Sequence, residues 1–221
     1  MKQLLVIIAL AFSTLLFAPS ASAAPEDYPV VFIHGWNAWN VDLGECYHCP
    51  TVALFEERGF VAYAPEMPDN GNTTYLDQHA QIIKDFIDSL GVAKVHLVGH
   101  SMGGMSTRYC IKVIPGCAEK VATYTSLDTL QYGSKSLCHF PVGWGRELCA
   151  SGPIVTAMNA GDDTPGDIFY TQLLGEDAKG DSAKLIDGGA CYGVAVGDHV
   201  QMPFNPVVID RVVQSLRGVC P

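Results

Sequence analysis

The chain has 221 residues, of which 48% are hydrophobic, and this fits one globular domain with a full-sized apolar core. Its 23 acidic residues outnumber the 13 basic ones, so the formal net charge is −10 at pH 7. A surface this acidic argues against nucleic acid or an anionic membrane as the partner, and leaves a neutral small-molecule or lipid substrate open.

The first segment has the pattern of a secretory signal peptide. Lys2 gives a positive charge, an apolar run continues to Ala18, and small residues in an Ala-x-Ala arrangement end at Ala23. We expect residues 1–23 to be removed and residues 24–221 to form one domain of an exported protein, either extracellular or periplasmic. The alternative is an N-terminal membrane anchor, because the apolar run is near the shortest length that spans a bilayer. Stable membrane insertion elsewhere is not expected, and neither is a stable oligomer.

All eight cysteines lie after this segment, and an even number in an exported chain indicates disulfide bonds. Spacing alone does not fix the pairing. The simplest hypothesis pairs sequence neighbours, namely Cys46 with Cys49, Cys110 with Cys117, Cys138 with Cys149, and Cys191 with Cys220. A zinc or redox site at Cys46-Tyr-His-Cys49 is the alternative, although no second ligand pair has a recognisable spacing.

Apolar runs typical of buried strands alternate along the chain with stripes typical of helices. The predicted strands are 28–34, 60–63, 94–98, 121–126, 168–174 and 190–196, and the predicted helices are 51–58, 75–90, 102–114 and 206–216. This order favours an α/β fold, with a compact and mostly parallel sheet of about six strands and helices on both faces. Residues 133–166 are rich in Gly, Pro and Ser, and predict a long excursion with at most one short helix near 154–159 rather than a large lid domain.

The stretch Val95 to Gly104 predicts a buried strand that turns sharply into a helix at Ser101. The turn has the pattern Gly-x-Ser-x-Gly, which also occurs in ordinary turns. A serine at such an elbow stands clear of its own backbone and can act as a nucleophile. Gly99 and Gly103 relieve crowding on either side, and Gly104 lets the helix lie close to the strand.

A serine nucleophile needs a base, and among the histidines well past Ser101 only His139 and His199 qualify. His199 follows the last predicted strand, which is where the base that serves a serine at such an elbow is expected, whereas His139 has no strand before it. We therefore expect His199 to be the base.

The base needs a carboxylate to orient it. This acid should follow the end of a strand that lies between the serine and the histidine in the sequence. Asp177 follows the predicted strand 168–174 and is our choice. Glu176 and Asp181 are the alternatives, and Asp198 is a weaker one because it is adjacent to His199.

An oxyanion needs two backbone N–H donors. The N–H of Met102 is expected to supply one at the helix N-terminus, and the N–H of Trp36, after the His34-Gly35 turn, the other. This chemistry requires no metal and no cofactor.

The motifs Val31-Phe-Ile-His-Gly-Trp-Asn37, Gly99-His-Ser-Met-Gly-Gly104 and Gly197-Asp-His199 together resemble the small secreted bacterial triacylglycerol lipases, the class 2 lipases of the α/β-hydrolase superfamily. The resemblance implies hydrolysis of carboxylic esters through an acyl-enzyme by Ser101, Asp177 and His199. The segment Thr125 to Leu130 departs from the family, which usually has a Gly-Thr-Pro turn there. Phe140 and Trp144 could form an apolar flap or a small satellite core.

Four other functions stay open on sequence alone. A polyester depolymerase or a short-chain carboxylesterase would use the same triad, and an α/β hydrolase without activity could serve as a binding module. Acyl transfer to an alcohol instead of water is also compatible with these residues.

Overall fold

The computed structural model describes residues 27–36, 48–68, 75–140, 143–188, 191–195 and 197–221. The expected signal peptide and Cys46 lie outside these ranges.

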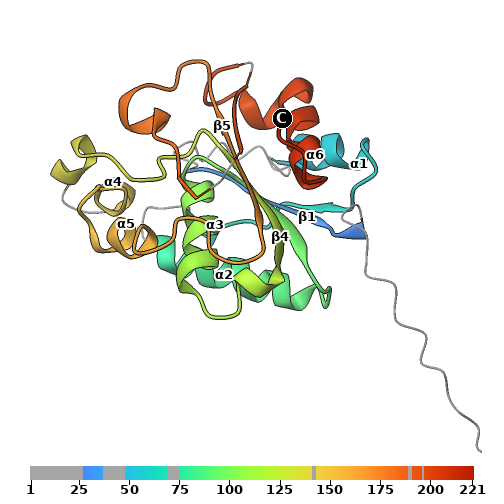
Figure 1. Cartoon of the computed structure of the whole chain (residues 1–221), viewed down its shortest axis with the longest axis horizontal. Helices are drawn as coiled ribbons and strands as arrows, with labels where there is room; N and C mark the ends of the chain where they lie inside the picture. Colours follow the sequence, from blue (N-terminus) through green and yellow to red (C-terminus); the bar gives the residue numbers. More distant parts are fainter. Residues whose placement is uncertain (1–26, 37–47, 69–74, 141–142, 189–190, 196) are drawn as a thin grey trace, which may run out of the picture.

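A parallel sheet forms the centre of the protein (Figure 1). Its strands lie in the order β2-β1-β3-β4-β5-β6, and each neighbouring pair is parallel. The strands are β1 (Val30–Ile33), β2 (Ala62–Tyr63), β3 (Val95–His100), β4 (Val121–Leu127), β5 (Phe169–Leu174) and β6 (Cys191–Val194). The predicted six-stranded, mostly parallel sheet is confirmed.

Helices cover both faces of the sheet, because alternate side chains of each buried strand point to opposite faces. Val31 and Ile33 of β1 pack in the cluster that includes residues of α2 and α3, whereas Val30 and Phe32 pack with α1 and α6. The helices are α1 (Cys49–Glu56), α2 (Leu76–Ser89), α3 (Met102–Val113), α4 (Gly143–Glu147), α5 (Pro153–Met158) and α6 (Pro206–Leu216), with 3-10 turns at Ala118–Lys120, Ser136–His139, Gly180–Ala183 and Met202–Phe204.

The excursion after β4 holds more helix than the sequence predicts. It contains α4, α5 and a 3-10 turn, so the expectation of at most one short helix is wrong. These helices are too short to show a helical period. Tertiary packing stabilises them, because Val155 and Met158 of α5 and Leu148, which follows α4, bury against Met102 and Met105 of α3 in a third apolar cluster. The side chain of Trp144, expected as part of a flap, lies outside the described atoms, while Phe140 is exposed.

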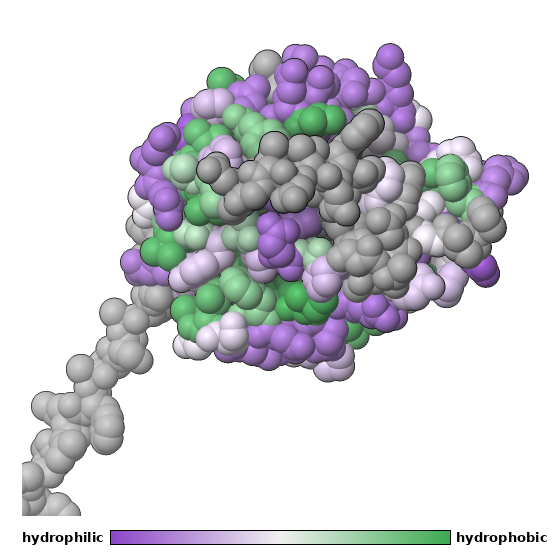
Figure 2. Space-filling view, turned by 180° about the vertical axis from the view of Figure 1, so that it is seen from behind, coloured by the Kyte–Doolittle hydropathy of each residue, from purple (hydrophilic) through white to green (hydrophobic). Residues whose placement is uncertain are grey.

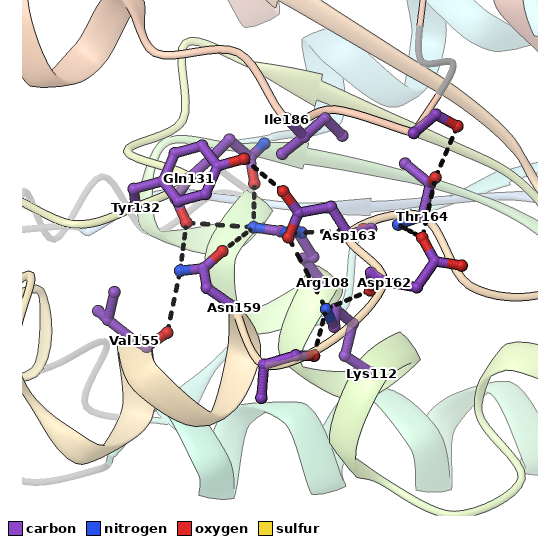
Figure 3. A network of polar contacts seen from close by, with 12 residues as sticks. Arg108, Lys112, Gln131, Tyr132, Val155, Asn159, Asp162, Asp163, Thr164 and Ile186 are labelled. Atoms are coloured by element: carbon purple, nitrogen blue, oxygen red, sulfur yellow. Dashed lines mark hydrogen bonds and ion pairs between the residues drawn. The ribbon is translucent and has the colours of Figure 1, made fainter.

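A buried polar network ties the excursion to α3 (Figure 3). Arg108 is fully buried, and its guanidinium contacts the Asp163 carboxylate at 2.5 Å and the Asn159 side-chain oxygen at 2.7 Å. It also donates to the backbone carbonyl of Gln131 at 3.1 Å. The Tyr132 hydroxyl donates to the same Asp163 carboxylate. Both ends of the excursion are thereby held against the helix that follows Ser101.

Disulfides close three of the expected loops, Cys110–Cys117, Cys138–Cys149 and Cys191–Cys220. These three pairs are confirmed. Cys49 is also disulfide-bonded, and its expected partner Cys46 lies outside the described residues.

The face opposite the one in Figure 1 carries apolar side chains in separate areas, with a group of polar side chains between them (Figure 2). Within the described ranges no helix is long and apolar enough to cross a membrane.

Candidate active site

Ser101 lies at a strained elbow between β3 and α3. Its backbone has φ 55° and ψ −125°, a conformation that non-glycine residues rarely adopt. Its N–H donates to the Leu127 carbonyl of the neighbouring strand at 2.9 Å, which holds the elbow against β4. Such strain keeps the serine hydroxyl clear of the backbone.

The three glycines around the elbow lie where other atoms leave no space for a side chain. A Cβ on Gly99 would come within 2.5 Å of the Gly104 Cα, and one on Gly103 within 2.3 Å of the carbonyl oxygens of Ile33 and His34. A Cβ on Gly104 would lie 2.0 Å from the Thr129 hydroxyl oxygen. The glycines therefore allow α3 to pack directly on β1 and β3.

His199 links the serine to a carboxylate. Its Nε2 lies 3.0 Å from the Ser101 Oγ, and its Nδ1 lies 2.6 Å from an oxygen of Asp128. The carboxylate fixes the tautomer, because it can only accept and so requires the proton on Nδ1. Nε2 then accepts from the serine hydroxyl. The structure brings Ser101 and His199 together as expected, but Asp128, not Asp177, contacts His199.

Asp128 follows β4 directly and is 5% exposed. Its backbone φ is 44°, and its N–H donates to the Leu173 carbonyl of β5 at 2.8 Å. Burial alone would raise its pKa, but the hydrogen bond and positive charge of His199 outweigh burial, so the pKa of Asp128 is lowered. The carboxylate is thus ionised at neutral pH. The sequence contained a feature that could have pointed to Asp128, since this residue lies at a strand end in the segment that departs from the lipase pattern.

The other acids proposed from the sequence have different surroundings. Asp177 lines the same cavity as Ser101 but makes no hydrogen bond to His199. Asp181 accepts from the Ser134 hydroxyl at 2.7 Å and pairs with Lys184. Asp198 accepts the N–H groups of Val200 and Gln201, both at 3.0 Å, and Glu176 is exposed.

His100 positions the loop that carries His199. Its Nε2 donates to the His199 carbonyl at 2.7 Å, and the two rings lie 4.8 Å apart. Burial and the nearby positive charge of His199 lower the pKa of His100 to about 3, so it stays neutral. The pKa of His199 is raised instead, chiefly by its hydrogen bond to Asp128. Of the two rings, only His199 is suited to take up a proton near neutral pH.

The turn after β1 approaches Ser101 closely. A Cβ on Gly35 would lie 2.7 Å from the Ser101 Cβ. The His34 ring is buried beside it, with the Met67 N–H donating to Nε2 at 3.3 Å and Nδ1 lying 2.9 Å from the Gly35 carbonyl. Because Nε2 accepts, Nδ1 carries the proton and donates to that carbonyl. A planar trans peptide then directs the Trp36 N–H away from His34.

A cavity of about 570 Å³ opens onto these groups. Its size is within the range of ~300–1,000 Å³ that is usual for small-molecule sites. Apolar side chains line one side of the cavity, and both polar and apolar side chains line the side near His199. The apolar set is Trp36, Met102, Met105, Leu130, Leu137 and Leu148, and the mixed set includes Asp177, Ala178, Ser182, Val200, Pro203 and Phe204.

His48 also lines the cavity, although the sequence gave no reason to single it out. It stacks on His34 with ring centroids 4.7 Å apart, and burial, together with the closeness of the His34 and His100 imidazoles, lowers its pKa to about 3. Leu130, Leu137 and Leu148 were missed as well, because only the packing of the excursion brings them to the cavity.

Residues 28–147, more than half of the chain, match the alpha/beta hydrolase fold family. The chain belongs to this family. The match includes β1, the elbow and α3, and it ends in the excursion.

Among curated proteins the chain is similar to triacylglycerol lipases. It is 29% identical to the one from Burkholderia plantarii over 55% of this chain and 36% of the relative, and 27% identical to the one from Vibrio cholerae over 61% and 45%. It is also 27% identical to the putative methylesterase 11 of Arabidopsis thaliana over 80% of the chain and 45% of the relative. The chain thus spans less than half the length of these relatives.

Solved structures share the fold at low identity. Aspergillus fumigatus lipase B has a TM-score of 0.59 at 14% identity, over 79% of this chain and 46% of that structure. The alpha/beta hydrolase enzyme MGS-MChE2, from a sediment metagenome of the Mar Chica lagoon, has a TM-score of 0.58 at 18% identity over 86% and 90%. The family match and the curated relatives together make the chain a lipase- or esterase-like α/β hydrolase.

Proposed function

We propose that this protein is an exported serine hydrolase that cleaves carboxylic esters with an apolar acyl chain, through an acyl-enzyme. The observation that carries the proposal is the continuous contact from Ser101 to His199 to Asp128 at the edge of an apolar cavity. No metal or cofactor is needed for this chemistry.

His199 acts as the general base in this mechanism. Its Nε2 takes the proton of the Ser101 hydroxyl while the oxygen attacks the ester carbonyl, and the protonated ring then gives that proton to the leaving alcohol. Asp128 stays ionised, keeps the Nδ1 proton in place and stabilises the imidazolium. Water repeats the sequence on the acyl-enzyme and releases the acid. The triad is thus Ser101, His199 and Asp128, in place of the expected Asp177.

The Met102 and Trp36 N–H groups form the oxyanion hole in this proposal. Both residues line the cavity beside Ser101, and Met102 is the first residue of the twelve-residue helix α3. His34 supports the second donor, because its bond to the Gly35 carbonyl fixes the peptide plane that carries the Trp36 N–H. Its effect is through the backbone, so His34 is a positioning residue.

The acyl chain lies against the apolar side of the cavity. This side is formed by α3 and by the excursion, whose Leu137 and Leu148 have no polar atom to offer a substrate. Burial of apolar surface favours binding by ~25 cal/mol per Å², so affinity rises with chain length until the cavity is full. A monomeric protein suffices for all of these steps.

Export is supported by the disulfides of the described chain, since such bonds persist in oxidising compartments. We propose that residues 1–23 are the removed signal and that residues 24–221 form the catalytic domain. N-terminal sequencing of secreted material that began at residue 1 would contradict this part of the proposal.

Labelling with a fluorophosphonate tests the central claim. The wild type should become labelled at Ser101, located by mass spectrometry, and Ser101→Ala should lose both the label and p-nitrophenyl ester hydrolysis by many powers of ten. A folded Ser101→Ala variant with near wild-type activity would overturn the mechanism. An intact wild type that does not label would favour a binding module.

The substrate class needs a separate comparison. Rates on p-nitrophenyl esters of increasing chain length, on emulsified triglyceride and on polyester film distinguish a lipase from a short-chain esterase and a polyester depolymerase. The apolar side of the cavity predicts higher kcat/KM on medium or long chains than on acetate.

A further inference from the structure

Two carboxylates, those of Asp128 and Asp177, line the cavity that holds His199. Asp128 follows β4 and Asp177 lies three residues after β5, and these strands are parallel neighbours with Leu127 paired to Leu173. Their carboxyl ends therefore meet at the same edge of the sheet. Both aspartates line the cavity that holds Ser101 and His199.

Gly175 lies between the two carboxylates. A Cβ on this glycine would be 2.8 Å from an oxygen of Asp177 and 3.3 Å from an oxygen of Asp128. The absence of a side chain leaves the space between the acids open. The negative charge of Asp177 also reaches His199, where it adds to the upward shift that Asp128 mainly causes in the pKa of the ring.

Among the aspartates whose charges reach His199, Asp177 differs from Asp128 and Asp198 in its hydrogen bonding. Asp198, whose charge also reaches the ring, uses its carboxylate to accept the N–H groups of Val200 and Gln201. His100 is neutral and bonded to the His199 carbonyl. In the described part of the chain the Asp177 carboxylate accepts no hydrogen bond, and its side chain is exposed, so it can rotate at little cost.

We propose that Asp177 is a reserve acid, a positioning residue that accepts the Nδ1 proton of His199 when the Asp128 side chain is removed. In the intact site it acts on the imidazolium only through space. The inference rests on the proposed triad and extends it, because it assigns a role to a carboxylate that the triad does not use.

Two substitutions of Asp128 test the proposal, because one keeps a side chain in the space beside His199 and the other leaves that space empty. Asp128→Asn keeps the shape of the side chain, so it blocks Asp177 and can hold His199 in the wrong tautomer. In a Ser-His-Asp hydrolase that substitution costs about 10⁴-fold in kcat. Asp128→Ala vacates the position and lets Asp177 approach. We expect kcat of Asp128→Ala to exceed that of Asp128→Asn by at least about tenfold.

Double variants identify the acid responsible. Adding Asp177→Asn to Asp128→Ala should remove the advantage and bring kcat to the level of Asp128→Asn. Glu176→Gln is the matched control, since it neutralises an exposed acid of the same turn that does not line the cavity. It should leave the Asp128→Ala rate unchanged. In the intact triad, Asp177→Asn should cost about threefold or less, as for an exposed charge.

The pH profile separates this role from a structural one. In Asp128→Ala the acid limb of kcat/KM should stay near that of the wild type, because a carboxylate still supports the imidazolium. With Asp177→Asn added, the limb should move to lower pH. A merely structural aspartate would leave the limb in place.

Two results would overturn the reserve acid. One is an Asp128→Ala variant no faster than Asp128→Asn, and the other is an Asp128→Ala rate that Asp177→Asn does not lower. If Asp128→Ala fails to fold, Asp128→Gly replaces it, because φ 44° at this position favours glycine. Failure of the triad itself would show differently, as a wild type that does not label at Ser101.

Discussion

Removing the charge of Asp163 should destabilise the protein strongly, because it leaves Arg108 buried without a counterion. Arg108 is 0% exposed and Asp163 is 7% exposed, and Lys112 brings a second positive charge to 3.8 Å from the same carboxylate. Breaking a buried pair by removing one partner typically costs about 3–5 kcal/mol. Asp163→Asn keeps the side-chain shape, so nearly all of that cost comes from the charge.

Thermal and urea unfolding measure the effect. For a chain of this size 1 kcal/mol shifts the Tm by about 2–4 °C, so Asp163→Asn should lower it by roughly 6–20 °C. Arg58 and Asp210 supply a matched control, because they form an ion pair of 2.6 Å at the surface, where Asp210 is 61% exposed. Asp210→Asn should cost about 0–1 kcal/mol. Equal losses in the two variants would refute the reasoning.

The acid dependence of stability gives a second readout of the same pair. Burial raises the pKa of Asp163, but the Tyr132 hydroxyl and the Arg108 and Lys112 charges lower it by more. A carboxyl whose folded pKa is depressed contributes stability above its unfolded value and loses it as the pH falls through the folded value. Asp163→Asn should therefore flatten the loss of stability on acidification. An unchanged profile would mean that Asp163 does not titrate with folding.

Three further predictions concern activity. The side-chain amide of His34→Asn lies near the Nδ1 position and still donates a hydrogen bond, so this variant should retain most of kcat. The amide of His34→Gln matches Nε2 instead, so kcat should fall about 10-fold or more with little change in KM. Equal rates in the two variants would exclude a role for the contact with the Gly35 carbonyl. Leu137→Trp fills the apolar side of the cavity and should lower kcat/KM on long-chain esters but not on acetate, so a uniform loss across the ester series would place the acyl chain elsewhere. Activity should fall at low pH because protonated His199 cannot take the serine proton. The pKa of His199 is raised, so the acid limb of kcat/KM should have its midpoint above the ordinary imidazole value of 6.5. A midpoint below 6.5 would contradict the Asp128 contact.

Much of the fold followed from local patterns. Buried parallel strands appear as continuous apolar runs, and α2 and α6 show one apolar stripe each, so their positions were predicted to within a few residues. The excursion was not, because α4 and α5 have 5 and 6 residues and are stabilised by tertiary packing, that of α5 being against α3, rather than by their own sequence.

The elbow illustrates what a short motif can specify. Ser101 has a positive φ because the chain must turn from β3 into α3 within one residue, and the glycines beside it are required by contacts under 3 Å. His199 could be predicted because the loop after the last strand is the position from which a base reaches that elbow. Both are consequences of chain order along a parallel sheet.

The acid could not be chosen in this way. Asp128 and Asp177 both follow strands whose ends meet at one edge, so chain order admits either. The difference is three-dimensional, since Asp128 is buried at the end of β4 under the His199 ring, while Asp177 is exposed on a turn. The sequence by itself thus determined the sheet, the elbow and the histidine that contacts Ser101, which depend on local periodicity and chain order. Only the tertiary structure decided which carboxylate contacts His199, which side chains line the cavity, and how Arg108 is buried, because each depends on side chains that meet from distant segments.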